Sequence, residues 1–144
     1  MLSQKAKYGL RALVALAREG GGQVSAGELA TRAGAPRKFL EAILLSLSRE
    51  GLVASRRGKF GGYVLGRAAE EISFAEIIRL VDGPLALTPC VSRTAFRRCE
   101  DCRDLATCAL REALLRARDA TAAVLEGYSL ADAAQGAGAE LIES

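Results

Sequence analysis

The chain has 144 residues, of which half are hydrophobic, and its abundant leucine and alanine with no tryptophan favour helices over sheets. No run reaches the roughly 20 apolar residues of a membrane span, so we expect no membrane partner. Arg11 and Arg18 interrupt the apolar N-terminal stretch, which argues against a signal peptide. We therefore expect a cytoplasmic protein. The net charge of +3 is uneven: residues 1–70 carry 12 Lys and Arg against 5 Asp and Glu, and residues 71–144 carry 8 against 12, so the basic half indicates either a nucleic-acid contact or a solvated surface.

Three helices are predicted in the first third of the chain. Ser3 caps the first helix, which covers residues 4–19 and ends at a run of glycines. A Ser-x-x-Glu capping box at residues 25–28 begins the short second helix. A glycine turn leads to the third helix, where Pro36 suits the first turn and the helical pattern continues to about Glu50. The predicted inward stripe of the third helix consists of Phe39, Leu40, Ile43, Leu44 and Leu47.

A β-hairpin is predicted directly after these helices. Two short strands, at residues 52–56 and 63–65, enclose a glycine-rich loop with a basic tip. Two helices joined by a tight turn and followed by such a hairpin form a winged helix-turn-helix. We therefore predict a mainly α fold with a small β-hairpin, and a DNA-binding domain over residues 1–70.

The second half of the chain is predicted to contain a connecting region followed by a dimerisation helix. Residues 71–108 hold a connecting helix and a loop that contains every cysteine. Apolar residues then recur at helical spacing over residues 109–128, which gives the longest predicted helix. The winged-helix core alone could not cover this stripe, so we predict a dimerisation helix, with packing against its own domain as the alternative. The Ala/Gly-rich residues 129–144 are predicted to form a flexible tail.

Cations and glycines mark the candidate DNA-binding surface. Arg37 and Lys38 lie in the first turn of the predicted recognition helix, the part that usually reaches base edges or phosphates. Glu41, one turn further on, could accept a hydrogen bond from cytosine N4. The alternative is a solvated face on which Glu41 pairs with a neighbouring arginine. Hairpin glycines let the backbone approach a phosphate, although the turn needs glycines in any case. The predicted DNA-contacting residues are Ser3, Lys5, Tyr8, Arg37, Lys38, Glu41, Arg56, Arg57, Lys59, Gly61 and Gly62.

A cluster of cysteines is the second candidate site. The chain has no histidine and holds its four cysteines within 19 residues, at Cys90, Cys99, Cys102 and Cys108. A Cys-x-x-Cys core outside a secreted context indicates a metal or cluster site more often than a disulfide framework. Four thiolates suit an iron–sulphur cluster or a structural zinc ion, and a thiol switch that forms a disulfide is a third interpretation. Nearby Arg97, Arg98 and Arg103 would stabilise thiolates.

A resemblance to a known family rests on four segments, at residues 36–41, 50–53, 57–65 and 71–73. In this order, with a cysteine loop behind them, they resemble the iron–sulphur winged-helix repressors. That family includes the cluster-assembly regulator, the nitric-oxide-sensing repressor and the rhizobial iron regulator. The resemblance covers roughly residues 1–128 and implies a homodimer, formed through the long helix, on a partly palindromic double-stranded DNA operator.

The resemblance also assigns individual residues. It implies that Glu41 occupies the specificity-setting position of the recognition helix. It implies a wing signature of Gly61, Gly62 and Tyr63, which adds Tyr63 to the predicted DNA contacts. It further implies a cluster held between the cysteine loop and the partner subunit.

The cysteine loop departs from the family pattern of three cysteines separated by five-residue gaps. Eight residues separate Cys90 from Cys99, and two separate Cys99 from Cys102. Arg111 stands where some relatives have a histidine ligand. Other relatives use an acidic ligand from the first helix of the partner subunit, but the first acidic residue of this chain is Glu19, at the end of that helix. The simplest interpretation is that all four cysteines ligate a [2Fe–2S] or [4Fe–4S] cluster.

The predicted function is a transcription regulator of the repressor type, whose operator binding is controlled by the iron–sulphur cluster. A winged-helix regulator with structural zinc or a thiol/disulfide switch in the same loop is the alternative. The chain has no histidine, no phosphate-cradling motif and no nucleophile–base pair, so we predict no catalytic residue and no enzymatic activity.

Overall fold

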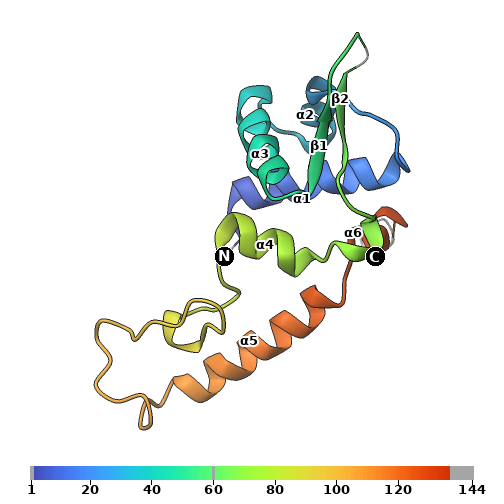
Figure 1. Cartoon of the computed structure of the whole chain (residues 1–144). Coiled ribbons are helices and arrows are strands. Elements are labelled where there is room, and N and C mark those ends of the chain that lie inside the picture. Colours follow the sequence, from blue (N-terminus) through green and yellow to red (C-terminus); the bar gives the residue numbers. More distant parts are fainter. Residues whose placement is uncertain (1, 60, 137–144) are drawn as a thin grey trace.

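Figure 1 shows the computed structural model, which describes residues 2–59 and 61–136. The helices and the hairpin of the N-terminal half lie together at one end, and the longest helix and the cysteine-containing loop lie at the other end. The elements in chain order are α1 (Gln4–Arg18), α2 (Ala26–Ala33), α3 (Arg37–Arg49), β1 (Val53–Arg56), β2 (Gly62–Leu65), η1 (Ala69–Glu71), α4 (Phe74–Asp82), η2 (Pro89–Val91), α5 (Arg111–Glu126) and α6 (Leu130–Ala134).

Local capping sets the starts of the first helices. Ser3 Oγ accepts a hydrogen bond from the Ala6 N–H at 3.0 Å, and Ser25 Oγ accepts one from the Glu28 N–H at 3.2 Å. Gly34 ends α2 in the left-handed conformation at φ 66°, which glycine adopts without steric cost. The helix-turn-helix forms as the sequence predicts.

The hairpin pairs β1 and β2 antiparallel, with Val53 opposite Leu65. Val24, in the loop before α2, adds an isolated bridge to Tyr63, with N–H···O distances of 3.0 and 2.8 Å. This bridge ties the wing to the helix-turn-helix. The mainly helical fold with one small sheet is therefore confirmed as a winged helix-turn-helix with additional helices.

One core joins the N-terminal helices to later parts of the chain. Its fully buried side chains from α1 to β1 include Leu13, Leu16, Leu29, Leu40, Ile43, Leu44, Leu47 and Leu52. Ile77 of α4 and Leu130 of α6 belong to the same core. The recognition helix is thus held from behind by α1, α2 and β1, while α4 and α6 pack against α1.

The prediction that Phe39 faces inward is wrong. Its side chain is 43% exposed, because the packing face of α3 is centred on Leu40, Leu44 and Leu47 and Phe39 lies at its margin. There its ring meets Tyr8 of α1 edge to face, with ring centroids 5.7 Å apart and planes at 82°.

The prediction of a flexible tail from residue 129 is also wrong for the part that the structure describes. Ser129 and Asp132 form a capping box that begins α6, and Leu130 is fully buried. The Leu130 N–H donates to the Ile72 carbonyl at 2.9 Å, which anchors the start of α6 beside η1, where α6 also packs against α1. The remainder of the predicted tail, residues 137–144, lies outside the described residues, as does Phe60 of the segment at residues 57–65.

The longest helix, α5, confirms the helix predicted over residues 109–128. Within the described part of the chain none of its residues is buried, and Val124 is 68% exposed. An ion pair of 2.7 Å between Arg79 and Glu126 connects α5 to α4. No helix in the described ranges combines the length and apolar character needed to cross a membrane.

Candidate functional site

The recognition helix α3 presents its predicted DNA-contacting residues on the outside. Arg37 and Lys38 are exposed in its first turn. Arg37 Nε donates to Glu41 Oε1 at 3.0 Å, so the arginine pairing considered for Glu41 is present. Both partners keep much of their surface in water, and such an exposed i, i+4 pair contributes only a few tenths of a kcal/mol. The pair therefore opens at little cost when a base or phosphate competes for it.

The wing projects from the same end of the molecule as α3 (Figure 1). Arg56, Arg57 and Lys59 are exposed along the hairpin. A Cβ on Gly62 would lie 2.5 Å from the Val24 carbonyl oxygen, and a Cβ on Gly61 would lie 2.7 Å from the Arg56 carbonyl oxygen. Close packing within the protein is thus sufficient reason for both glycines.

The start of α1 is engaged within the protein. Ser3 caps α1, and both its N–H and its hydroxyl donate to the Asp82 carboxylate at the end of α4. The Tyr8 hydroxyl accepts from Gln4 Nε2 at 2.9 Å while its ring packs on Phe39. Lys5 is exposed. The cap formed by Ser3 is thus confirmed, whereas its contact with Asp82 and the packing role of Tyr8 were not indicated by the sequence.

The four cysteines lie in or near the long connection between α4 and α5, residues 83–110, which we call the cysteine segment. All four are free thiols: Cys90 is buried at 6% exposure, Cys99 and Cys102 are half-buried, and Cys108 is exposed. The structure brings two of them together, because the Cys90 and Cys99 thiols lie close enough for each to shift the pKa of the other. Within residues 2–59 and 61–136, no three His, Cys, Asp or Glu side chains are grouped closely enough to hold a metal ion.

The paired thiols differ in acidity. Thr88 Oγ1 lies 3.4 Å from Cys90 Sγ, and this hydrogen bond lowers the pKa of the Cys90 thiol, with smaller contributions from Cys99 and Arg111. The pKa of Cys99 is raised, chiefly by its hydrogen bond to Cys90. Cys90 is therefore the better thiolate of the pair.

Two arginines of α5 hold the segment at Cys90. Arg111 Nη2 donates to the Cys90 carbonyl at 3.4 Å, and Arg118 Nη1 donates to the Val91 carbonyl at 2.6 Å. The side chain of Arg118 is only 14% exposed and also pairs with Asp119. We call these two carbonyl contacts of Arg111 and Arg118 the arginine clamp. The sequence singled out Arg111 only as a replaced histidine, and it gave no signal for Arg118, whose acceptor is 27 residues away.

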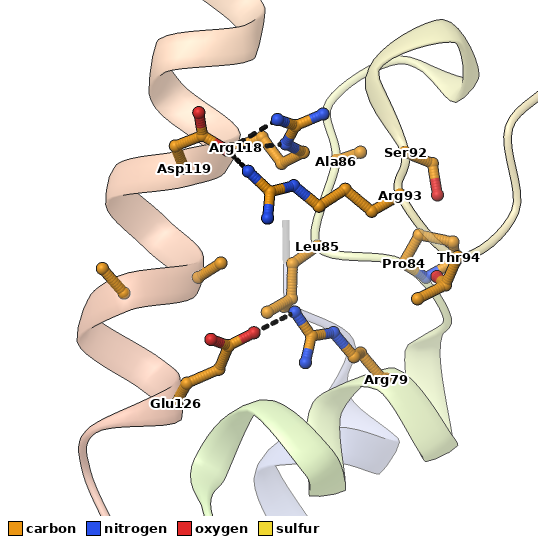
Figure 2. A pocket seen from close by; sticks show the side chains of 12 residues that line it. Arg79, Pro84, Leu85, Ala86, Ser92, Arg93, Thr94, Arg118, Asp119 and Glu126 are labelled. Carbon is orange, nitrogen blue, oxygen red and sulfur yellow. Dashed lines mark hydrogen bonds and ion pairs between the residues drawn. The ribbon is translucent and has the colours of Figure 1, made fainter.

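Figure 2 shows the neighbouring cavity between α4, the cysteine segment and α5, with a volume of about 200 Å³. Asp119 Oδ1 accepts from Arg93 at 2.9 Å and from Arg118 at 2.6 Å, and Glu126 accepts from Arg79 at 2.7 Å. The charged groups of this cavity thus form ion pairs with one another at the boundary between α5 and the elements that face it. The Arg93–Asp119 and Arg79–Glu126 ion pairs attach α5 to the cysteine segment and to α4.

The donor set suits a thiolate-bound metal group. Four sulphurs are available, and Arg111 places a cation beside Cys90. Arg111 Nε is buried and has no hydrogen-bond partner among the described residues. The predicted cations Arg97, Arg98 and Arg103 are exposed, and Arg98 donates to the Arg103 carbonyl instead. Ligation by four thiolates requires Cys102 and Cys108 to approach the Cys90–Cys99 pair.

Comparison with known proteins identifies the fold family. A family model described as Rrf2, iron-dependent transcriptional regulator, matches residues 2–136. The chain belongs to the Rrf2 family. Regulators of this family carry a helix-turn-helix, bind DNA and commonly act as dimers, so the resemblance found in the sequence is confirmed.

Several relatives match the chain over nearly its whole length. A putative HTH-type transcriptional regulator, rrf2-like, of Rhodobacter capsulatus is 41% identical over 149 aligned positions, with 99% of each chain covered. The structure of CymR, the global cysteine regulator of Bacillus subtilis, superimposes with a TM-score of 0.77 at 34% identity, covering 94% of this chain and 96% of that one. The structure of T. potens IscR superimposes with a TM-score of 0.74 at 28% identity, covering 95% and 88%.

Proposed function

We propose that this Rrf2-family chain is a homodimeric repressor whose affinity for a DNA operator depends on the state of its four cysteines, with an iron–sulphur cluster of [2Fe–2S] or [4Fe–4S] type as cofactor. The arginine clamp is the observation that carries this proposal, because it binds the backbone at Cys90 to α5. Residues 1–70 would bind DNA, residues 71–108 would sense, and residues 109–128 would dimerise.

DNA binding would use the two exposed cationic elements. In a symmetric dimer each α3 enters a major groove, where Arg37 and Lys38 reach phosphates or base edges. The Arg37–Glu41 pair opens there, which frees Glu41 to accept from cytosine N4. Arg56 and Arg57 of the wing contact phosphates or the adjacent minor groove.

Dimerisation would use the uncovered side of α5. Leu110 and Val124 are 69% and 68% exposed in the described chain. Apolar side chains at helical spacing on one helix are stabilised when a second helix covers them, at about 25 cal/mol per Å² of buried apolar surface. A second α5 supplies that cover and sets the spacing of the two recognition helices.

The cofactor would be held by Cys90, Cys99, Cys102 and Cys108, with Arg111 offsetting the negative charge of the thiolates. When bound, the cluster supplies a redox-active centre that oxidants degrade. The chain's own residues then do the coupling: a displacement at Cys90 moves its carbonyl, and Arg111 and Arg118 transmit that movement to α5.

A thiol switch is the second candidate, and the Cys90–Cys99 contact favours it. Cys90 thiolate attacks a hydroperoxide, releasing an alcohol or water and leaving a sulphenic acid. The Cys99 thiol then displaces water to form the disulfide, so two thiols lose two electrons to the peroxide bond. This reaction needs two of the four cysteines, whereas the cluster needs all four.

The decisive experiment is anaerobic purification with visible absorption and analysis of iron, sulphide and zinc, followed by operator binding. The cluster proposal expects brown protein with equal iron and sulphide, and loss of colour in both Cys90→Ser and Cys108→Ser. Colourless protein with peroxide-sensitive operator binding that needs Cys90 and Cys99, but neither Cys102 nor Cys108, would establish the thiol switch instead. One zinc per chain and no redox response would contradict both. If no DNA duplex is bound in any state, the assignment as a regulator is wrong.

A further inference from the structure

We propose that Ala42 and Leu45 of α3, which we call the apolar strip, read thymine methyl groups in the operator. This inference rests on the proposed DNA-binding function and assigns a base-reading role beyond that of Glu41. It follows from the placement of exposed apolar side chains on the helix that would enter the major groove.

The apolar strip lies on the outward side of α3. Leu40, Ile43, Leu44 and Leu47 face the core and are at most 1% exposed. Ala42 and Leu45, three residues apart, lie together on the opposite side, and Leu45 is 54% exposed. A leucine at that position contributes nothing to the core, so its apolar surface is stabilised only when another surface removes it from water.

Charge points to DNA as the surface that covers the strip. Lys38 precedes Ala42 by one turn, Arg49 follows Leu45 by one turn, and both cations are exposed. Cations at both ends of an apolar patch match a groove whose walls are phosphates and whose floor carries apolar atoms. In the major groove those atoms are the C5-methyl groups of thymine, and they distinguish A·T from the other pairs.

A second copy of the chain is a poorer candidate for covering the strip. The proposed dimer contact is α5, and Figure 1 shows α5 at the end of the molecule opposite α3. Contact through α5 leaves the strip uncovered. The wing, which projects beside α3, carries cations rather than a complementary apolar surface.

The test removes single methyl groups from the DNA. A duplex is first selected from random sequence by the wild-type protein, and each thymine is then replaced in turn by deoxyuridine, which pairs identically and lacks the methyl group. We expect at least one position in each half-site at which this replacement weakens wild-type binding by about fourfold, the value of one buried methyl group. At that position Leu45→Ala should bind the thymine and deoxyuridine duplexes equally.

The matched control is Leu87→Ala, which shortens another exposed leucine, in the cysteine segment, and should keep the wild-type preference for thymine. Leu45→Ala retains helix propensity at an exposed site, so it should fold, and circular dichroism checks that it does. The inference is overturned if wild type shows no deoxyuridine penalty, or if Leu45→Ala and Ala42→Gly both show the same penalty as wild type. Failure to select any duplex contradicts DNA binding itself, and the inference with it.

Discussion

The helix-turn-helix and the α5 region differ in how they are stabilised. In the first, α3 buries four large side chains against α1, α2 and the hairpin; in the second, the 16 residues of α5 bury none within the described chain. α5 packs the partly buried Leu125 against the core and is otherwise attached by polar contacts of Arg79, Arg111 and Arg118. An apolar core holds the predicted DNA-contacting residues rigidly, whereas attachment mainly through ion pairs and hydrogen bonds would leave α5 open to adjustment by a partner and by the cysteines.

Truncating the core should produce the largest effect on stability. Leu44→Ala removes a fully buried side chain and should lower the free energy of unfolding by about 2–5 kcal/mol, measured by urea titration. The neighbouring Leu45→Ala is the matched control and should change it by less than about 0.5 kcal/mol, because Leu45 is exposed. Equal losses in the two variants would contradict the packing of α3.

A charge on α5 should break the dimer while leaving the core intact. Val124→Glu should shift the protein towards monomer in sedimentation experiments and weaken duplex binding at least about tenfold, because a buried unpaired carboxylate opposes helix association. Leu45→Glu places the same charge on an exposed leucine of α3 and should remain dimeric. A dimer that survives Val124→Glu would exclude this side of α5 as the contact.

The arginine clamp should couple the two regions. In the wild-type protein we expect operator affinity to differ roughly 5- to 150-fold between the two cysteine states, the usual range of allosteric coupling. Arg118→Gln removes the donor to the Val91 carbonyl and should reduce this difference to within about twofold. Arg116→Gln, on the same helix but paired only locally with Glu112, should keep the full difference. Retained dependence in Arg118→Gln would show that the signal takes another route.

The wing should contribute a modest, sequence-independent part of the affinity. Arg57→Ala should weaken binding to every duplex and lower the slope of log K against log salt by about one unit per phosphate contact, doubled in a symmetric dimer. Arg116→Ala, far from the wing, should leave the slope unchanged. A wild-type slope in Arg57→Ala would place that arginine away from the DNA.

Low pH should slightly weaken the ion pairs that Asp119 forms with Arg118 and Arg93. Arg118, with help from Arg93, lowers the pKa of the Asp119 carboxyl below its usual range. A carboxyl whose folded pKa is depressed stabilises the protein above its unfolded pKa, and this contribution disappears as pH falls below about 4. Asp119→Asn should flatten that part of the pH profile of unfolding, and an unchanged profile would show that the ion pair adds no stability.

Features encoded over short distances could be predicted from the sequence. Ser3, Ser25 and Ser73 each cap a helix by bonding an N–H three residues ahead, and helical apolar spacing placed α3 and α5 to within a few residues. The same logic could have found α6, because Asp132 follows Ser129 at capping-box spacing. The alanine- and glycine-rich composition favoured a tail instead.

By itself, the sequence determined the winged helix-turn-helix, the recognition helix, the wing and the gathering of four cysteines in one segment. Only the tertiary structure decided that Phe39 packs against Tyr8 outside the core, that Cys90 lies beside Cys99, and that Arg118 donates a hydrogen bond to the Val91 carbonyl next to Cys90. The physical reason is range. A cap or a helical stripe depends on neighbours within one turn, whereas these contacts join residues many positions apart and exist only after the core has brought their elements together.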